Sequence, residues 1–237
     1  MNWTLGLTIE PLHDVTATLR SPDFAQLVAI DIACGIGDMP LDSMQANPVD
    51  VARSVSRTAC GEIVALGGII ESLAVAVSTR TLLERVLTGV EATLAELPEE
   101  VSTVYSCENY TKSLSTSIAV TAVGMASRST LRASTLREGD HAMLLGTGYR
   151  PPHTGELVNL MRVRELTRHP KVIQVIPVGS GGAYSDFLKI SRCCGLVLDG
   201  MERLQQPGGP GLQYIVVAAD LIHAKDLAVL GKLQANA

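Results

Sequence analysis

The chain has 237 residues, a formal net charge of −5, and 46% hydrophobic against 18% charged residues. This balance excludes a disordered chain, and the length suits one α/β domain or one domain with a small appendage. Aromatic residues make up only 3% and no basic stripe is present, so a nucleic-acid partner is not expected.

Three features bear on where the protein works. The start, MNWTLGLTIEPLHD, lacks the charged n-region and the long apolar h-region of a signal peptide. The most apolar stretch, residues 60–79, contains Glu62 and Glu71, so we expect no membrane span. The five cysteines are odd in number and show no metal-ligand spacing, which indicates reduced thiols. We therefore expect a cytoplasmic protein without a membrane partner.

Hydrophobic periodicity and turn residues define the expected elements. Strands are expected over residues 5–9, 26–32, 72–77, 101–106, 114–123, 141–145, 172–178 and 212–218. Helices are expected over 49–66, 79–97, 154–168 and 183–193, with a last helix after residue 220. The first helix has the clearest start, because Asn47 can cap it and Pro48 suits its first turn.

The expected strands and helices do not alternate strictly. The strands between residues 101 and 145 are expected to be antiparallel neighbours, so the fold class is α/β, a mixed-sheet sandwich rather than a doubly wound parallel sheet. Residues 146–155 are the expected linker. They divide the chain into a main domain, 1–150, and a small C-terminal α/β portion, 151–237.

The first candidate site is a Gly-rich loop with three carboxylates. Asp31 lies near the end of an apolar strand, and Asp38 and Asp42 follow it within the loop. Carboxylate oxygens suit a hard cation such as Mg²⁺, and Gly35 and Gly37 would let the backbone approach phosphates. Alternatively, this is an acidic surface loop in which the aspartates cap turns.

Glu62 and the segment around residue 108 are further candidates. Glu62 lies on an apolar helical face, where it either points inward to a metal or occupies the solvent side of an amphipathic helix. Glu108 and Asn109 follow a strand in a polar loop, which either presents them to a ligand or forms an ordinary hairpin tip.

The last candidate is the run Gly179–Ser180–Gly181–Gly182 between a strand and a helix. Free amides at a helix start bind anions, although a plain tight turn has the same composition. The run is not a Walker loop, because no GK[ST] follows. The five histidines are scattered, no GxSxG is present, and Cys193 and Cys194 fit helix packing, so a nucleophilic hydrolase is not indicated.

The order of these motifs resembles a known family. The run VAIDIACGIGDMPLD, followed by RTACGEIVALGG on a helix, resembles the N-terminal ATP-binding domain of the aminoimidazole ribonucleotide synthetase-like (PurM-like) superfamily. The segments SCENYTKSLSTSIAVTAVG and LREGDHAMLLGTG are similar to the later strands of that domain. The resemblance covers residues 20–150. It implies an α/β sandwich of this type, ATP with Mg²⁺, and a homodimer whose sheets form a barrel-like interface.

The remainder resembles a reduced C-terminal portion. PVGSGGAYSDF and PGGPGLQYIVVAADL look like the corresponding part of a short branch that includes the α-ribazole kinases, which phosphorylate a nucleoside of the cobalamin lower ligand. This resemblance implies an ATP- and Mg²⁺-dependent kinase with a small, nucleoside-like substrate. Three alternatives remain: a synthetase-type reaction on the same scaffold, a non-catalytic nucleotide-binding regulatory dimer, or a dimer with no nucleotide site.

Motifs and resemblance together assign residues to roles. The assigned residues are Asp31 and Glu108 for catalysis, Asp31, Asp38 and Glu62 for the metal, and Gly35, Gly37, Asn109, Gly179, Ser180 and Gly181 for the nucleotide. Two departures from the family weigh against catalysis. Met39 stands where the family often has a lysine, and Val104–Tyr105–Ser106 stands where it has a Thr-Gly run. A lysine would stabilise the charge on a transferring phosphoryl group.

Overall fold

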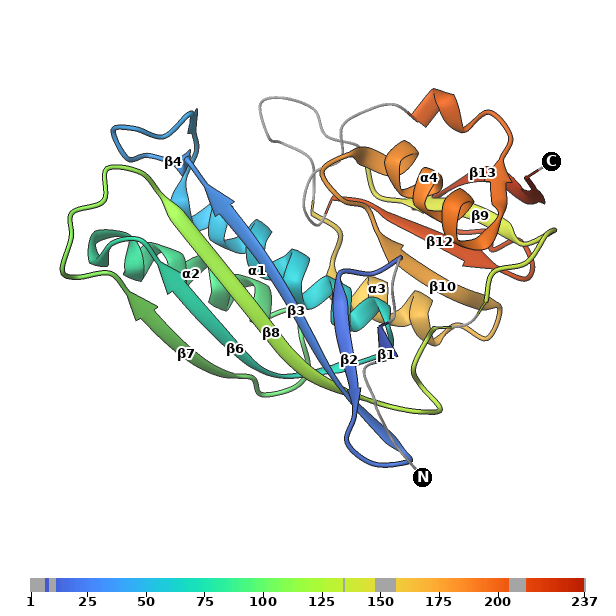
Figure 1. The fold of residues 1–237 in the computed structure, drawn as a ribbon, viewed down its shortest axis with the longest axis horizontal. Helices are drawn as coiled ribbons and strands as arrows, with labels where there is room; N and C mark the ends of the chain where they lie inside the picture. The colour runs from blue at the N-terminus through green and yellow to red at the C-terminus, as the bar shows by residue number, and fades with distance from the viewer. Residues whose placement is uncertain (1–6, 9–11, 134, 148–156, 205–211, 237) are drawn as a thin grey trace.

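The computed structural model describes residues 7–8, 12–133, 135–147, 157–204 and 212–236, and shows two β-sheets with helices packed between and beside them (Figure 1). Within these residues, the first sheet has six strands in the order β1-β2-β3-β8-β6-β7. The second has five, in the order β10-β12-β9-β13-β11. A short parallel pair joins β4 (Ile36–Gly37) and β5 (Met44–Gln45).

The first sheet is mixed, as expected. Its strands are β1 (Leu7–Thr8), β2 (Val15–Leu19), β3 (Phe24–Cys34), β6 (Ile69–Val77), β7 (Ser102–Cys107) and β8 (Ser117–Ser127). Only β6 and β7 pair in parallel. Side chains of β8 alternate between buried and half-buried along all its 11 residues, so one face of the sheet packs on the core.

Helices cover the inner face of this sheet. They are α1 (Pro48–Ala65) and α2 (Leu83–Leu94), the latter preceded by a 3₁₀ turn over Arg80–Leu82. Asn47 caps α1 as expected, since its side chain accepts a hydrogen bond from the Val49 amide at 3.0 Å. α1 packs against β3 and β8 on one side and against α3 and β10 on the other, so it lies between the two sheets.

The second sheet is antiparallel throughout. Its strands are β9 (His141–Leu145), β10 (Val172–Pro177), β11 (Leu196–Leu198), β12 (Tyr214–Ala218) and β13 (Leu227–Ala235). The remaining helices are α3 (Leu160–Arg168), α4 (Gly182–Cys194) and a 3₁₀ turn over Met201–Leu204. Every residue of β12 is buried, because α1 and α3 lie on one side of this sheet and α4 on the other.

A single hydrophobic core joins the two halves. It contains residues from the inner face of the first sheet, from α1, α2 and α3, and from one face of the second sheet. A smaller core lies between α4 and the other face of the second sheet. No helix within the described residues is long and apolar enough to cross a bilayer.

The structure differs from the sequence predictions in how several strands pair. The segment after residue 220 forms β13 rather than a helix, because pairing with β9 and β11 outweighs its helix-forming composition. β7 is not a neighbour of β8, since β6 lies between them. β9 belongs to the second sheet, so the chain passes between sheets after Ser127 rather than near residue 150. Most of the predicted linker, residues 148–155, lies outside the described residues.

Candidate functional site

Asp31 occupies an inner position of β3. It shares this face with Leu27, Ala29 and Ala33, which are buried in the core. Burial raises the pKa of Asp31 to about 6, although hydrogen bonds from the Ile32 amide and a side chain of α1 lower it. The nearby carboxylates of Glu62 and Asp14 contribute to this raised pKa. An acidic group with this pKa can exchange a proton near neutral pH.

Glu62 points inward from α1 rather than into solvent. Only 7% of the residue is exposed, so the solvent-side interpretation is wrong. Its Oε2 lies 3.5 Å from Nδ1 of the buried His13. Burial raises the pKa of Glu62, and the charge of Asp14 adds to this, while the interaction with His13 opposes it. Glu62 is therefore an acidic group held inside the protein beside a weak base.

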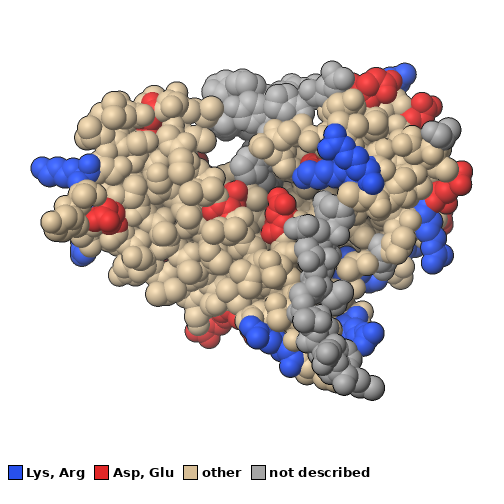
Figure 2. All heavy atoms as spheres, in the orientation of Figure 1, with Lys and Arg blue, Asp and Glu red and all other residues tan. Residues whose placement is uncertain are grey.

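Asp14, Asp31 and Glu62 form what we call the acidic cluster, which connects β2, β3 and α1. Figure 2 shows acidic side chains near the middle of the drawn face. Oε2 of Glu62 and both ring nitrogens of His13 are buried and lack a hydrogen-bond partner among the described residues. Buried polar atoms normally have partners, so the cluster has unused capacity for a cation, water or ligand.

The acidic cluster suits Mg²⁺ only in part. The described residues contain no group of three or more His, Cys, Asp or Glu side chains that could hold a metal ion by themselves. Mg²⁺, however, is often held by one or two carboxylates together with substrate phosphates and water. Asp31 and Asp14 supply carboxylates of that kind, since Asp31 is half-buried and Asp14 is exposed. The donors therefore fit a magnesium ion that arrives with a nucleotide.

Asp38 does not belong to this cluster. Its carboxylate forms an exposed ion pair with Arg85 on α2, which neutralises its charge. The assignment of Asp38 to the metal beside Asp31 and Glu62 is therefore not supported by its position.

The Gly-rich loop is closed by Asp42. This carboxylate accepts hydrogen bonds from the Met39 amide at 2.8 Å, the Ser115 hydroxyl at 3.0 Å, and the amide and hydroxyl of Thr116 at 2.7 and 2.6 Å. Burial raises the pKa of Asp42, but these bonds lower it overall. Gly37 packs so closely on Thr116 that a Cβ would overlap its side chain. The Gly35 amide donates to the Thr116 carbonyl at 2.8 Å. Gly35 and Gly37 therefore serve the packing of the loop itself, and the Gly35 amide is not free for a phosphate.

Glu108 and Asn109 lie away from Asp31. Glu108 is exposed and accepts hydrogen bonds from the Tyr110 and Thr111 amides, so it forms a local turn in the loop that connects β7 to β8. Its strand, β7, is separated from β3 by β6 and β8, and neighbouring strands lie ~4.8 Å apart, so the separation is roughly 14 Å. The chain itself therefore does not bring Glu108 to Asp31.

The second Gly-rich run connects β10 to α4. The Gly179 amide donates to Oδ2 of Asp186 at 2.9 Å, and the Gly182 amide donates to the Gly179 carbonyl at 3.0 Å. Oδ1 of Asp186 pairs with Nζ of Lys189 at 2.7 Å. The Asp186 carboxylate thus already binds one amide at the start of α4, while Ser180 and Gly181 are exposed.

Sequence reasoning missed three polar groups near the cluster: His13, Asp14 and Lys189. His13 and Asp14 precede β2, a strand that was not predicted although Val15, Ala17 and Leu19 alternate with polar residues. Lys189 lies in a helix that was predicted, but one sequence cannot show which elements of the second half face the first.

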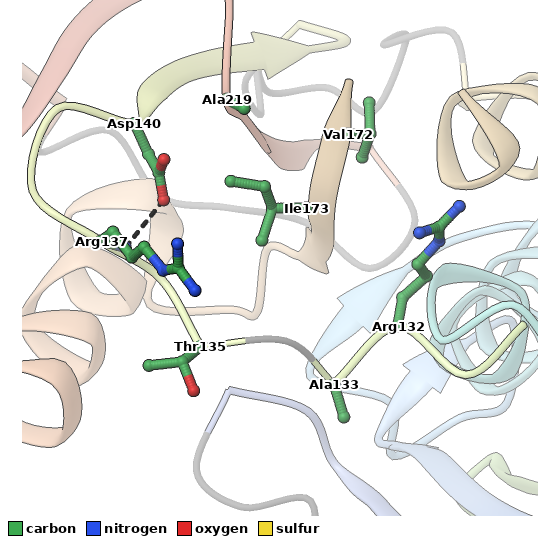
Figure 3. A pocket seen from close by; sticks show the side chains of 8 residues that line it. All are labelled: Arg132, Ala133, Thr135, Arg137, Asp140, Val172, Ile173 and Ala219. Carbon is green, nitrogen blue, oxygen red and sulfur yellow. Dashed lines mark hydrogen bonds between the residues drawn. The ribbon is translucent and has the colours of Figure 1, made fainter. Parts of the chain in front are cut away.

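A cavity of about 560 Å³ lies elsewhere, between the β8–β9 connection and the second sheet (Figure 3). The residues that line it are Arg132, Ala133, Thr135, Arg137, Asp140, Val172, Ile173 and Ala219. It lies at the start of β10, whereas the Gly-rich run follows the end of that strand. None of the residues assigned to a site from the sequence lines this cavity.

Fold and sheet topology define this chain as a mixed α/β protein with the PurM-like fold, and comparison with solved structures agrees. AaThiL complexed with AMPPCP and TMP matches with a TM-score of 0.69 and 15% identity, over 95% of this chain and 85% of that one. Thiamine monophosphate kinase from Aquifex aeolicus matches with a TM-score of 0.68 and 14% identity, over 93% of this chain and 88% of that one. PurL of T. maritima complexed with ADP matches with a TM-score of 0.70 and 12% identity, over 98% of this chain but only 43% of PurL. The sequence itself matches no family model and no curated protein.

Proposed function

We propose that this protein is an ATP- and Mg²⁺-dependent kinase that phosphorylates a hydroxyl group of a small, nucleoside-like molecule, with α-ribazole as the first acceptor to test. The observation that carries this proposal is the acidic cluster at the junction of the two halves, in which Glu62 is buried and Asp31 half-buried, on the fold of a kinase that binds AMPPCP. The protein would act in the cytoplasm, without nucleic-acid or membrane partners.

In the proposed reaction the acceptor oxygen bonds to the γ-phosphorus as the bond to the β–γ bridging oxygen breaks. ADP leaves with that electron pair, and the hydroxyl proton passes to a carboxylate. A bound Mg²⁺ would neutralise phosphate charge, with Asp31 and Asp14 as its protein ligands and Glu62 behind them. The exposed Ser180 and Gly181 would meet a phosphate at α4.

The test is thermal unfolding with ATP or ADP, with and without Mg²⁺. A ligand present at one hundred times its dissociation constant stabilises the native state by roughly 2.7 kcal/mol, which is several degrees for a chain of this size. We expect a Mg²⁺-dependent rise that Asp31→Asn abolishes. Asp38→Asn serves as the control, because Asp38 pairs with Arg85 away from the cluster. The absence of any rise in the wild type at millimolar nucleotide would refute the proposal.

We further propose that the protein is a homodimer. Large hydrophobic side chains lie exposed on the outer face of the first sheet, among them Ile30 at 63% exposure, Ile32 at 60%, and Val104 at 65%. Such a patch on a sheet surface is typical of an interaction site, and a second copy of the sheet would cover it. The closed barrel would also remove the open edge of β7.

Two other functions remain for the same scaffold. A synthetase-type reaction is favoured by the likeness to PurL complexed with ADP. Product analysis separates it from a kinase, which yields a stable phosphorylated nucleoside. A regulatory dimer is favoured by Met39, which packs partly buried against the core and supplies no charge. Nucleotide binding without turnover across a panel of nucleosides would support the regulatory dimer.

A further inference from the structure

Lys189 on α4 is held in a defined place. Its Nζ lies 2.7 Å from Oδ1 of Asp186, whose side chain is only 4% exposed. The other carboxylate oxygen of Asp186 accepts the Gly179 amide at 2.9 Å. The Lys189 side chain is itself 43% exposed. The ammonium group is thus anchored through a buried carboxylate to the Gly-rich run and still open to a ligand.

This lysine lies beside the acidic cluster. Leu12 packs against the small core to which α4 contributes Phe187 and Ile190, so the segment before β2 reaches the second half of the protein. Burial lowers the pKa of Lys189, but its interaction with Asp186, and after it the charges of Asp14 and Glu62, raise that pKa overall. Figure 2 shows basic side chains over α4 beside the central acidic ones.

The charges of the cluster favour a further cation besides Mg²⁺. Asp14, Asp31 and Glu62 repel a polyphosphate, so a nucleotide binds there only where positive groups offset them. The two buried arginines on the facing helices are already paired, Arg57 with Glu96 and Arg164 with Glu99. Lys189, by contrast, is close enough to Asp14 and Glu62 for their charges to act on it, and 43% of its side chain is exposed.

We propose that Lys189 binds the terminal phosphate of a nucleoside triphosphate at this site, with Asp186 as the positioning residue that fixes it and links it to the Gly179 amide. This assignment rests on the proposed function and adds a specificity to it. The site would distinguish a triphosphate from a diphosphate through a lysine of α4. The C-terminal portion would then contribute directly to binding rather than only pack against the first half.

The experiment compares two ligands by calorimetry in the presence of Mg²⁺: AMPPCP, which has a terminal phosphate, and ADP, which lacks it. The proteins are the wild type, Lys189→Met, Lys189→Arg, and Lys225→Met, an exposed lysine as the matched control. We expect Lys189→Met to weaken AMPPCP binding about tenfold or more, as for one lost charge-assisted hydrogen bond, and to leave ADP binding within about twofold. Lys189→Arg should restore most of the AMPPCP affinity, and Lys225→Met should bind as the wild type does.

A merely structural role for Lys189 predicts a different result. In that case Lys189→Met lowers the unfolding temperature and weakens both ligands equally, which would overturn the assignment while the proposed function stands. Unchanged affinity for both ligands would overturn it as well. If the wild type binds neither ligand, the proposed function fails first, and the assignment fails with it.

Discussion

The hydroxyl of Tyr214 on β12 occupies the space that a side chain on Gly61 of α1 would fill. A Cβ built on Gly61 overlaps the Tyr214 oxygen. Tyr214 is 1% exposed, its hydroxyl has no hydrogen-bond partner among the described residues, and burial raises its pKa. Because Gly61 precedes Glu62, this contact fixes the acidic cluster relative to the second sheet.

Gly61→Ala should therefore destabilise the protein. Overpacking a filled core costs about 2 kcal/mol, and α1 cannot move away without disturbing its contacts with β3 and β8. Urea denaturation measures the loss. Tyr214→Phe alone should be nearly neutral or stabilising, since it removes a buried hydroxyl without a partner, and it should recover part of the stability in the double variant. Equal stability of Gly61→Ala and wild type would contradict this contact.

Asp31→Asn should change how stability depends on pH. The pKa of Asp31 is about 6 in the folded protein against 3.8 ordinarily, so between pH 4 and 6 the folded state binds more protons than the unfolded state. This group therefore stabilises the fold at low pH, and its contribution falls as pH rises through that window. The asparagine variant lacks this fall.

The measurement is the free energy of unfolding of both proteins from pH 4 to 8. The stability of Asp31→Asn relative to wild type should rise between pH 4 and 6 and stay constant above about pH 7. Asp38→Asn, whose carboxylate pairs with Arg85 on the surface, is the control and should show no such rise. A flat difference for Asp31→Asn would mean that the carboxylate is not buried among the other acids.

Local patterns predicted most elements of the fold. The apolar runs that form β3 and β8 and the Asn47–Pro48 start of α1 are signals within a few residues, and the structure confirms these two strands and this helix. Most errors concern pairing between distant segments, namely β13, the place of β9 and the strand order around β6, whereas β2 was missed despite its local alternation. Strand order depends on contacts that periodicity does not describe.

The same distinction explains the site. Asp31 and Glu62 were singled out because a charge is costly in an apolar strand or helix face, and the structure places them together. Asp38 and Glu108 were predicted from the composition of their loops. Loop composition does not show which helix or strand lies beside a residue in the fold. Lys189 could not be found at all, since its relation to the cluster depends on how the second half packs on the first.

Glu99→Gln should destabilise the junction between the two halves. Glu99 forms a two-pronged ion pair with Arg164 of α3, with distances of 2.7 and 2.5 Å, and also accepts the Ile70 amide. Burial alone would raise the pKa of Glu99, but these bonds lower it. Because Arg164 is 4% exposed, removing its counter-charge should cost about 3 kcal/mol at pH 7.

Urea denaturation at several pH values measures this loss of stability and shows how the contribution of Glu99 depends on pH. The lowered pKa means that Glu99 stabilises the fold above pH ~4.5, and that this contribution is lost as pH falls further. The difference between wild type and Glu99→Gln should therefore shrink toward pH 3. The neighbouring Glu100→Gln is the matched control, because Glu100 is exposed, and it should change stability by less than about 0.5 kcal/mol.

Ile32→Lys tests the proposed homodimer. The side chain is 60% exposed on the outer face of β3, so a lysine there costs the monomer little but places a charge in the sheet-to-sheet contact. Sedimentation should show a dimer for wild type and a monomer for the variant at the same concentration. Val229→Lys, an equally exposed position on β13 of the second sheet, should remain a dimer. A wild-type protein that sediments as a monomer would refute the homodimer, and a variant that stays dimeric would move the interface to another face.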